Sequence, residues 1–417
     1  MLTPEYMQKI TEQAEEYAAM LRTYIINLIV RRISARLGRG VDYLFTASDK
    51  WQIDVLQESG QILEDIQKQI IKFTNLQEKE VKEAMEEAGI KALQYDDKIY
   101  REAGLNPVPL RESPVMTRQM QRVYEATNGE IRNFTRTTAI EAQKLYINEC
   151  DNAYRLVTSG AVSYNQAVRE AIDNAISHGG VVKYPTGHKD TLETAVTRSV
   201  RTGISQATGN IQMTRMEEMD WDIILTSAHL GARSGDGGMN PTNHLWWQGQ
   251  FFSRTGRTKK FPDFVKSTGY GTVTGLCGAN CRHGFGPGDG VNNPYADIQT
   301  EDNARMEELN KQQRALERRI RKTKQELVGM KAAVDSVKEE PLKFELQHEY
   351  DRKAALLRRQ NEAYNTFCKD NDLKKLTERL KIAKWNREQS AAANGAATRY
   401  ENARKEYHER DKKPDQG

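Results

Sequence analysis

The N-terminal part of the chain repeats its apolar positions with the period of an α-helix. Between Met7 and Ile25 they recur every three or four residues, which predicts an amphipathic helix. Thr3 followed by Pro4 is typical of a helix start, because threonine caps free N–H groups and proline fits the first turn. The same period continues, and it predicts an N-terminal helical bundle over residues 1–104.

A proline-rich segment then interrupts the helical pattern. Three prolines lie between Gly104 and Pro114, and such a cluster marks the boundary of an element. The helical pattern returns over residues 115–219, which form a second predicted helical region. Within it, residues 181–185 (Val-Val-Lys-Tyr-Pro) are expected to form a short strand that ends in a turn.

Residues 220–299 have a different pattern, with short aliphatic runs, frequent glycine and three tryptophans. Residues 221–226 read as a strand, because aliphatic side chains cluster there over a short run. Glycine-rich connections allow loops to converge on a site. This segment is therefore expected to be a small, compact α+β domain at the centre of a mainly α-helical chain.

The C-terminal part is highly charged and carries a heptad pattern. From Met306 to Val337 apolar positions alternate three and four residues apart, and a second apolar stripe follows Pro341, which is expected to end the first helix. The pattern predicts an antiparallel helical hairpin over residues 300–390, whose seam contacts only the return helix. Few apolar anchors follow, so residues 391–417 are expected to be a flexible tail.

Composition limits the classes of function. The 417 residues include 62 basic and 58 acidic side chains, a net charge of +4, which is too balanced for the whole protein to hold nucleic acid electrostatically. Four cysteines in so long a chain do not form a disulfide scaffold. The most apolar segment, Tyr24–Val30, is far shorter than the roughly 20 residues needed to cross a bilayer. No membrane association and no secretory signal are expected.

The residues with the most specific chemistry lie between His229 and His283. Thiolate and imidazole are the ligands that zinc prefers, and a glycine next to a ligand permits a tight turn. A structural zinc site is therefore one hypothesis, with the ligands drawn from Cys277, Cys281, His283, His244 and His229. An equally supported alternative is that two reduced thiols pack in a small core while His283 bonds to the backbone.

Catalysis is a weaker hypothesis for the same residues. A cysteine–histidine pair or a hydrolytic metal centre could be built from them, and a metal-dependent DNA hydrolase or nuclease is the alternative function. No carboxylate has a clear place beside them, since Asp236 lies in a glycine-rich loop and suits a turn. A basic run on the heptad helix could contact DNA phosphates or an acidic protein, or could be a solvated face; it comprises Arg318, Arg319, Arg321 and Lys322.

The order of these motifs resembles the phage minor capsid protein 2 family, the minor head proteins of tailed phages and prophages related to Mu F-like head morphogenesis proteins. The family pattern is similar to His-x-x-x-Arg, then His-x-x-Trp-Gln-Gly, then Gly-Leu-Cys-Gly-x-Asn-Cys-Arg-His. Segments 197–201, 312–325 and 367–376 also resemble it. The matching residues include His229, Arg233, His244, Trp247, Gln248, Gly249, Cys277, Asn280, Cys281, Arg282 and His283.

The resemblance implies a virion component without enzymatic activity or a small-molecule substrate. Such proteins are present in few copies, bind near the portal vertex together with capsid and procapsid proteins, and in some cases contact packaged DNA. Assembly would take place in the cytoplasm of the bacterial host. One departure is the longer link at residues 235–242, which leaves open how His244 is placed relative to His229.

Overall fold

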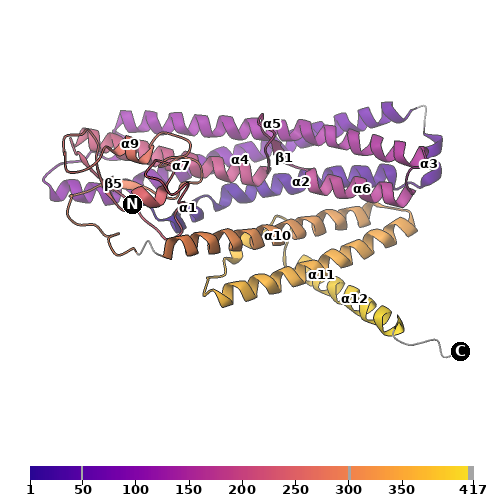
Figure 1. Ribbon diagram of the computed structural model, residues 1–417. Helices are drawn as coiled ribbons and strands as arrows, with labels where there is room; N and C mark the ends of the chain where they lie inside the picture. Colours follow the sequence, from indigo (N-terminus) through magenta and orange to yellow (C-terminus); the bar gives the residue numbers. More distant parts are fainter. Residues whose placement is uncertain (48–49, 299–301, 412–417) are drawn as a thin grey trace. The chain divides into compact units, whose positions relative to one another are not determined.

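The computed structural model describes residues 1–47, 50–298 and 302–411. It is mainly helical (Figure 1), with a few short antiparallel strands, which confirms the predicted fold class. No helix among these residues is long and apolar enough to cross a membrane. The longer helices are α2 (Glu12–Leu37), α4 (Trp51–Glu102), α5 (Pro114–Thr158), α6 (Tyr164–His178), α7 (Leu192–Glu218), α10 (Asn303–Ser336), α11 (Glu340–Asp370) and α12 (Arg387–Asp411).

The N-terminal helices begin as the sequence predicts and then differ from it. Helix α1 (Pro4–Ile10) is capped by Thr3, whose hydroxyl accepts a hydrogen bond from the Tyr6 N–H at 3.2 Å. A short helix, α3 (Val41–Thr46), precedes α4. Helix α4 then runs without a break from Trp51 to Glu102. Gly89 does not break it, because its missing side chain lets Ile211 of α7 pack closely.

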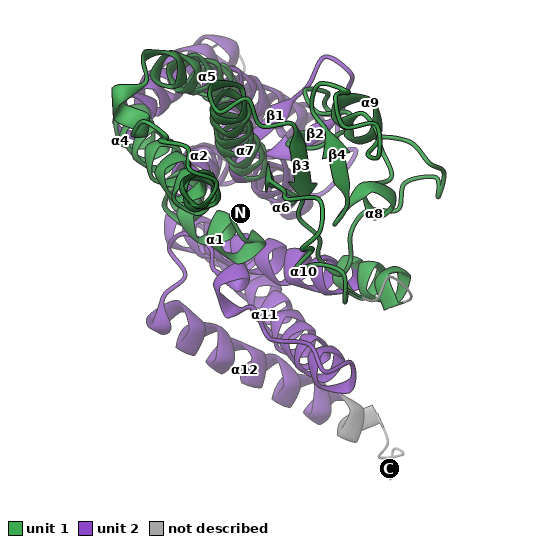
Figure 2. Cartoon of the chain, turned by 90° about the vertical axis from the view of Figure 1, so that its left-hand side faces the viewer, with its two compact units in different colours: residues 1–17, 74–134, 194–311 green, residues 18–73, 135–193, 312–417 purple. Residues whose placement is uncertain are grey.

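The chain divides into two compact units that differ from the predicted consecutive segments (Figure 2). Helices α2, α4, α5 and α10 each supply residues to both units. A linear division of the sequence could not predict this, because the apolar stripe of a long helix does not show where its partners change. Unit 1 comprises residues 1–17, 74–134 and 194–311, and unit 2 comprises residues 18–73, 135–193 and 312–417.

Unit 1 contains the one three-stranded sheet among the described residues. Strand β3 (Ile223–Thr226) lies at its centre and pairs antiparallel with β4 (Phe251–Ser253) and β5 (Phe285–Pro287). Two short helices, α8 (His244–Trp247) and α9 (Phe264–Thr268), lie in the connections. The apolar core around this sheet includes Tyr100, Met216, Ile224, Trp247, Phe252, Phe264, Leu276, Cys277 and Phe285. The expected strand and the small α+β region are therefore present.

Unit 2 contains the predicted antiparallel hairpin of α10 and α11, which lie side by side in Figure 1. Gln313 contacts Cys368 near one end of the pair, and Glu326 binds Lys353 further along. Pro341 lies in the first turn of α11, so it begins the return helix, whereas α10 already ends at Ser336. A two-stranded hairpin of β1 (Val181–Lys183) and β2 (Lys189–Thr191) contains the expected short strand.

The first hairpin helix does not contact only its return helix, contrary to the sequence-based expectation. Gln325 of α10 accepts a hydrogen bond from Thr23 of α2 at 3.1 Å. A side chain placed on Gly329 would lie 2.7 Å from Ile176 of α6. Helix α10 therefore packs on two further helices of unit 2, and the hairpin is part of a larger core.

Helix α12 occupies most of the segment that was expected to be a flexible tail (391–417). Three small side chains, Ala393, Ala396 and Ala397, are buried, and Arg399 binds both carboxylate oxygens of Asp351 on α11 at 3.0 and 2.8 Å. Alanine permits close helix approach but contributes little to a hydrophobic pattern, which explains why the sequence did not predict this packing. Residues 412–417 lie outside the described part of the chain.

Candidate metal centre

The three-stranded sheet brings motif residues that are distant in the sequence together at one end of its strands. Strands β3 and β5 are antiparallel, with Thr226 opposite Phe285, so the residues after β3 and those before β5 meet. His229 follows β3, and Cys281 and His283 precede β5. His244 is the first residue of α8, whose N-cap is the side chain of Asn243.

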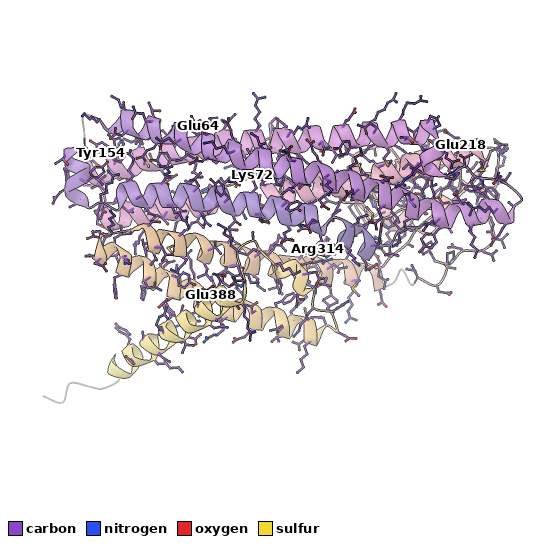
Figure 3. The ribbon with its side chains drawn as sticks, turned by 180° about the vertical axis from the view of Figure 1, so that it is seen from behind. Glu64, Lys72, Tyr154, Glu218, Arg314 and Glu388 are labelled. Atoms are coloured by element: carbon purple, nitrogen blue, oxygen red, sulfur yellow. The ribbon has the colours of Figure 1, made fainter. Side chains whose placement is uncertain are left out.

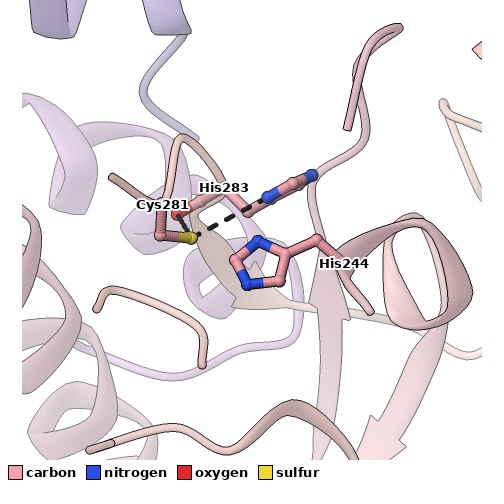
Figure 4. Close-up of side chains that lie close together, drawn as sticks. All are labelled: His244, Cys281 and His283. Atoms are coloured by element: carbon pink, nitrogen blue, oxygen red, sulfur yellow. Dashed lines mark hydrogen bonds between the residues drawn. The ribbon is translucent and has the colours of Figure 1, made fainter. Parts of the chain in front are cut away.

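Three of the predicted ligands lie together in this place. The side-chain donor atoms of His244, Cys281 and His283 are all within 4.8 Å of one another, and Figure 4 shows these side chains turned towards one another. The Cys281 Sγ atom lies 3.8 Å from His283 Nδ1. His283 and His244 are buried, and Cys281 is half-buried.

The Gln248 side chain fixes which nitrogen of His283 faces the sulfur. Its Oε1 atom accepts hydrogen bonds from the His229 backbone N–H at 3.1 Å and from His283 Nε2 at 3.0 Å. Because a carboxamide oxygen only accepts, Nε2 carries the proton. The lone pair of His283 therefore lies on Nδ1 and points towards Cys281.

His244 is held from its other edge. Its Nε2 atom lies 2.9 Å from the Thr274 carbonyl oxygen. The Arg233 guanidinium also donates to this oxygen, at 2.8 Å, and its Nη2 atom is 2.6 Å from His244 Nε2. Buried Trp247 packs against both histidine rings, with centroid distances of 4.6 Å to His244 and 4.9 Å to His283. Nδ1 is therefore the atom of His244 that is available to the cluster.

Burial keeps these side chains neutral. It lowers the pKa of His244 to about 4, with Arg233 acting in the same direction. Burial also lowers the pKa of His283 well below its usual range, and the neighbouring histidines contribute. Burial raises the pKa of the Cys281 thiol. Two imidazoles and a thiol are side chains of the types that zinc prefers as ligands.

The other two predicted ligands have different places. Cys277 is buried in the apolar core, where a side chain on Gly209 of α7 would lie 3.2 Å from its sulfur. Burial raises the pKa of its thiol to about 12. The His229 ring stacks on His283 with a centroid distance of 4.3 Å. Cys281 also packs against this apolar core, so both thiols make the contacts of the packed-thiol alternative, and Cys281 belongs in addition to the cluster described above.

Glycine and asparagine shape the loop that carries the cysteines. A Cβ atom on Gly275 would collide with the Gly269 carbonyl group, and one on Gly278 with the Val273 carbonyl oxygen. Asn280 has a φ of 60°, in the left-handed region that asparagine tolerates. Asn280 and Arg282 are exposed. The two glycines and Asn280 thus shape the loop, and Arg282 flanks it. Among the described residues, neither Asn280 nor Arg282 forms a side-chain hydrogen bond to His244, Cys281 or His283.

Sequence reasoning missed two supports of the site. The Thr274 carbonyl is a backbone group, so no residue type signals its role. Asn303, at the start of α10, accepts hydrogen bonds from the N–H groups of Gly231 and Ala232, each at 2.9 Å. These bonds hold the loop between His229 and Arg233, and only the position of Asn303 at the start of a long helix could have indicated a structural role. Gly249, with a φ of 63°, closes the turn after Gln248.

The predicted basic face of α10 is only partly available to a partner. Arg318, Arg319 and Lys322 are exposed, and they follow Arg314 of the same helix, which is labelled in Figure 3. Arg321 differs, because its guanidinium donates to the Arg379 carbonyl oxygen at 2.6 Å, in the short helix η3 (Thr377–Leu380). Its inclusion in the predicted DNA contact is therefore not supported.

Helices that bury a small sheet, with a neutral histidine–cysteine cluster at its edge, define a mainly helical protein with one compact α+β region. The model of the family described as phage minor capsid protein 2 matches residues 2–369, and the chain belongs to this family. It is thus a phage minor capsid protein, a structural component of the virion that interacts with other head proteins. No curated protein and no solved structure matches it.

Proposed function

We propose that this minor capsid protein is a low-copy component of the phage head, bound at the portal vertex on the inner side of the capsid. The family match over residues 2–369 is the observation that carries this proposal. Assembly takes place in the bacterial host cytoplasm, and no catalytic step or small-molecule substrate is involved. Exposed Arg318, Arg319 and Lys322 contact packaged DNA without reading its sequence.

Exposed apolar side chains of α4 support docking on another head protein. Ile53, Leu56 and Ile71 are each more than half exposed. Ile53 and Ile71 are 18 residues apart, which is about five helical turns, and Leu56 is one turn from Ile53. The three apolar side chains therefore point to the same side of the helix, where the exposed side chains of Glu64 and Gln67 lie between Leu56 and Ile71. Exposed apolar side chains of this kind suit burial against a protein partner, and we assign the portal protein as that partner.

Cross-linking of purified virions, followed by mass spectrometry, tests the portal assignment. The expected result is that cross-links from α4 reach mainly the portal protein. Replacing Ile53, Leu56 and Ile71 by serine should reduce incorporation into heads several-fold while leaving the melting temperature unchanged. The matched control replaces Gln57, Lys68 and Lys72, which are exposed on the same helix, and should incorporate normally. Cross-links to the major shell protein alone would overturn the assignment.

The alternative function, a metal-dependent DNA hydrolase, has less support from the geometry. Among the described residues, the group that could hold a metal consists of two imidazoles and one thiol, and it includes no carboxylate. A hydrolytic metal centre commonly needs a base that activates water. DNA cleavage that depends on added zinc or manganese, and that is lost on changing His244, would favour the hydrolase.

A further inference from the structure

We propose that His244, Cys281 and His283 bind one zinc ion in unit 1, and that Gln248 orients His283 towards it. Zinc binds imidazole nitrogen at about 2.0–2.1 Å and thiolate sulfur at about 2.3 Å, so tetrahedral ligands of these two kinds lie about 3.6 Å apart. The Cys281 sulfur is 3.8 Å from His283 Nδ1. All three donor atoms lie within 4.8 Å of one another, so small side-chain movements suffice.

The ring planes decide which histidines belong to the site. An imidazole lone pair lies in the plane of its ring, so a shared metal must lie close to both planes. The rings of His244 and His283 are inclined by 66°, and their planes cross. The rings of His229 and His283 are inclined by only 20° and are stacked at 4.3 Å. Nearly parallel planes do not meet near the rings, so His229 is excluded as a ligand.

Residues outside the three proposed ligands orient the two histidine rings. Gln248 accepts the His283 Nε2 proton, which directs Nδ1 to the ion. Nε2 of His244 lies 2.9 Å from the Thr274 carbonyl oxygen and 2.6 Å from Nη2 of Arg233, and these two contacts fix the orientation of its ring. Metal-bound histidines commonly donate their second N–H to such an acceptor, and the partner fixes the ring orientation. His283 is thus presented with the Nδ1 lone pair that a cation requires, and the His244 ring is held in a fixed orientation beside it.

A bound zinc ion would act on folding. Its ligands come from the first turn of the four-residue helix α8 and from the loop before β5, two segments with little regular structure. Because metal binding free energy adds to folding free energy, the ion would join α8 to the edge of the sheet. This inference holds whichever head protein the chain contacts.

The test uses the full chain, purified under reducing conditions, loaded with zinc and desalted. Elemental analysis should find about one equivalent of zinc in the wild-type chain and in the matched controls Cys277→Ser and His229→Ala. Cys281→Ser and His244→Ala should hold less than about 0.2 equivalents. Cobalt titration of the wild-type chain should give the visible absorption of a tetrahedral site with a thiolate-to-cobalt band. Cobalt spectroscopy needs no variant, so it stays informative if one fails to fold.

Two outcomes would overturn the zinc site. One is a wild-type chain that binds less than about 0.2 equivalents of zinc after loading and shows no cobalt spectrum. The other is a folded Cys277→Ser variant that loses zinc as fully as Cys281→Ser does. Gln248→Leu should weaken zinc affinity by about 10–100-fold in competition with a chelator, and Gln248→Glu should restore most of it. Unchanged affinity in Gln248→Leu would refute the orienting role.

Discussion

Arg36 is a buried cation in unit 2, and its charge is balanced by a single carboxylate. Its side chain is 3% exposed. The guanidinium binds both oxygens of Glu58, at 2.9 and 2.7 Å, and it lies 3.1 Å from the Tyr146 hydroxyl, which donates to the same carboxylate. A paired buried charge contributes little net stability, whereas a buried charge that loses its partner is strongly destabilising.

Replacing Glu58 by glutamine should therefore destabilise unit 2. Arg36 would keep its charge inside the helices without a carboxylate, and the expected loss is about 2 kcal/mol, below the usual 3–5 because Glu58 is partly exposed. Thermal denaturation at pH 7 measures this loss. The control is Glu64→Gln, an exposed carboxylate on the same helix, which should change stability by less than about 0.5 kcal/mol.

The same pair predicts an acid sensitivity. Burial alone would raise the pKa of Glu58, but hydrogen bonds from Arg36 and Tyr146 more than reverse this, so its pKa in the folded chain lies below its ordinary value. A lowered carboxyl pKa gives stability that is present above the unfolded-state pKa and is lost as pH falls through the folded-state pKa. Wild-type stability should fall on acidification below about pH 4.5, and Glu58→Gln should reduce that slope. Equal slopes would contradict the assignment.

The sequence located the cysteine–histidine cluster but not its membership. The cysteines, histidines and neighbouring glycines indicated that the site lies between His229 and His283. The order of these motifs along the chain matched the pattern of the family. Residue type alone does not separate Cys277 from Cys281, which differ because the first lies within the apolar core and the second beside His244 and His283. The planes of His229 and His244 likewise depend on tertiary contacts, which spacing cannot supply.

At the scale of elements, α10 is a core helix of unit 2 rather than half of an independent hairpin. Replacing fully buried Ile320 by aspartate should destabilise the unit by several kcal/mol, because the carboxylate has no buried partner. Limited proteolysis should then cleave in α2 and α6 as well as after residue 302. Arg319→Asp, at an exposed position beside it, is the control and should not increase cleavage. Cleavage confined to α10 and α11 would show that the hairpin folds independently of α2 and α6.

Helix existence was predictable from the apolar period, and helix boundaries were less so. The caps at Thr3 and the break between residues 104 and 114 are local features, and both are present. The continuity of α4 and the packing of α12 depend on contacts made by glycine and alanine, whose small side chains give a weak hydrophobic signal. The length of α4 and the packing of α12 therefore depend on tertiary contacts that the sequence pattern does not reveal.

At the scale of the whole molecule, a net charge of +4 limits DNA binding to local patches. If Arg318, Arg319 and Lys322 contact phosphates, duplex binding should be weak, independent of sequence and lost as salt rises. Changing all three to glutamine should reduce the slope of log affinity against log salt by about 3. The control changes Lys68, Lys72 and Lys79, three exposed lysines of α4, and should leave the slope unchanged. Fluorescence anisotropy measures both, and equal slopes would refute the contact.

We propose that this minor capsid protein is built into the phage head in few copies. Absolute quantification by mass spectrometry, on virions purified through a density gradient and treated with nuclease, tests it most directly. The chain should be present in every preparation, at a small and constant ratio to the portal protein and far below the major shell protein. A chain that is absent from purified virions, or that is as abundant as the shell protein, would contradict it.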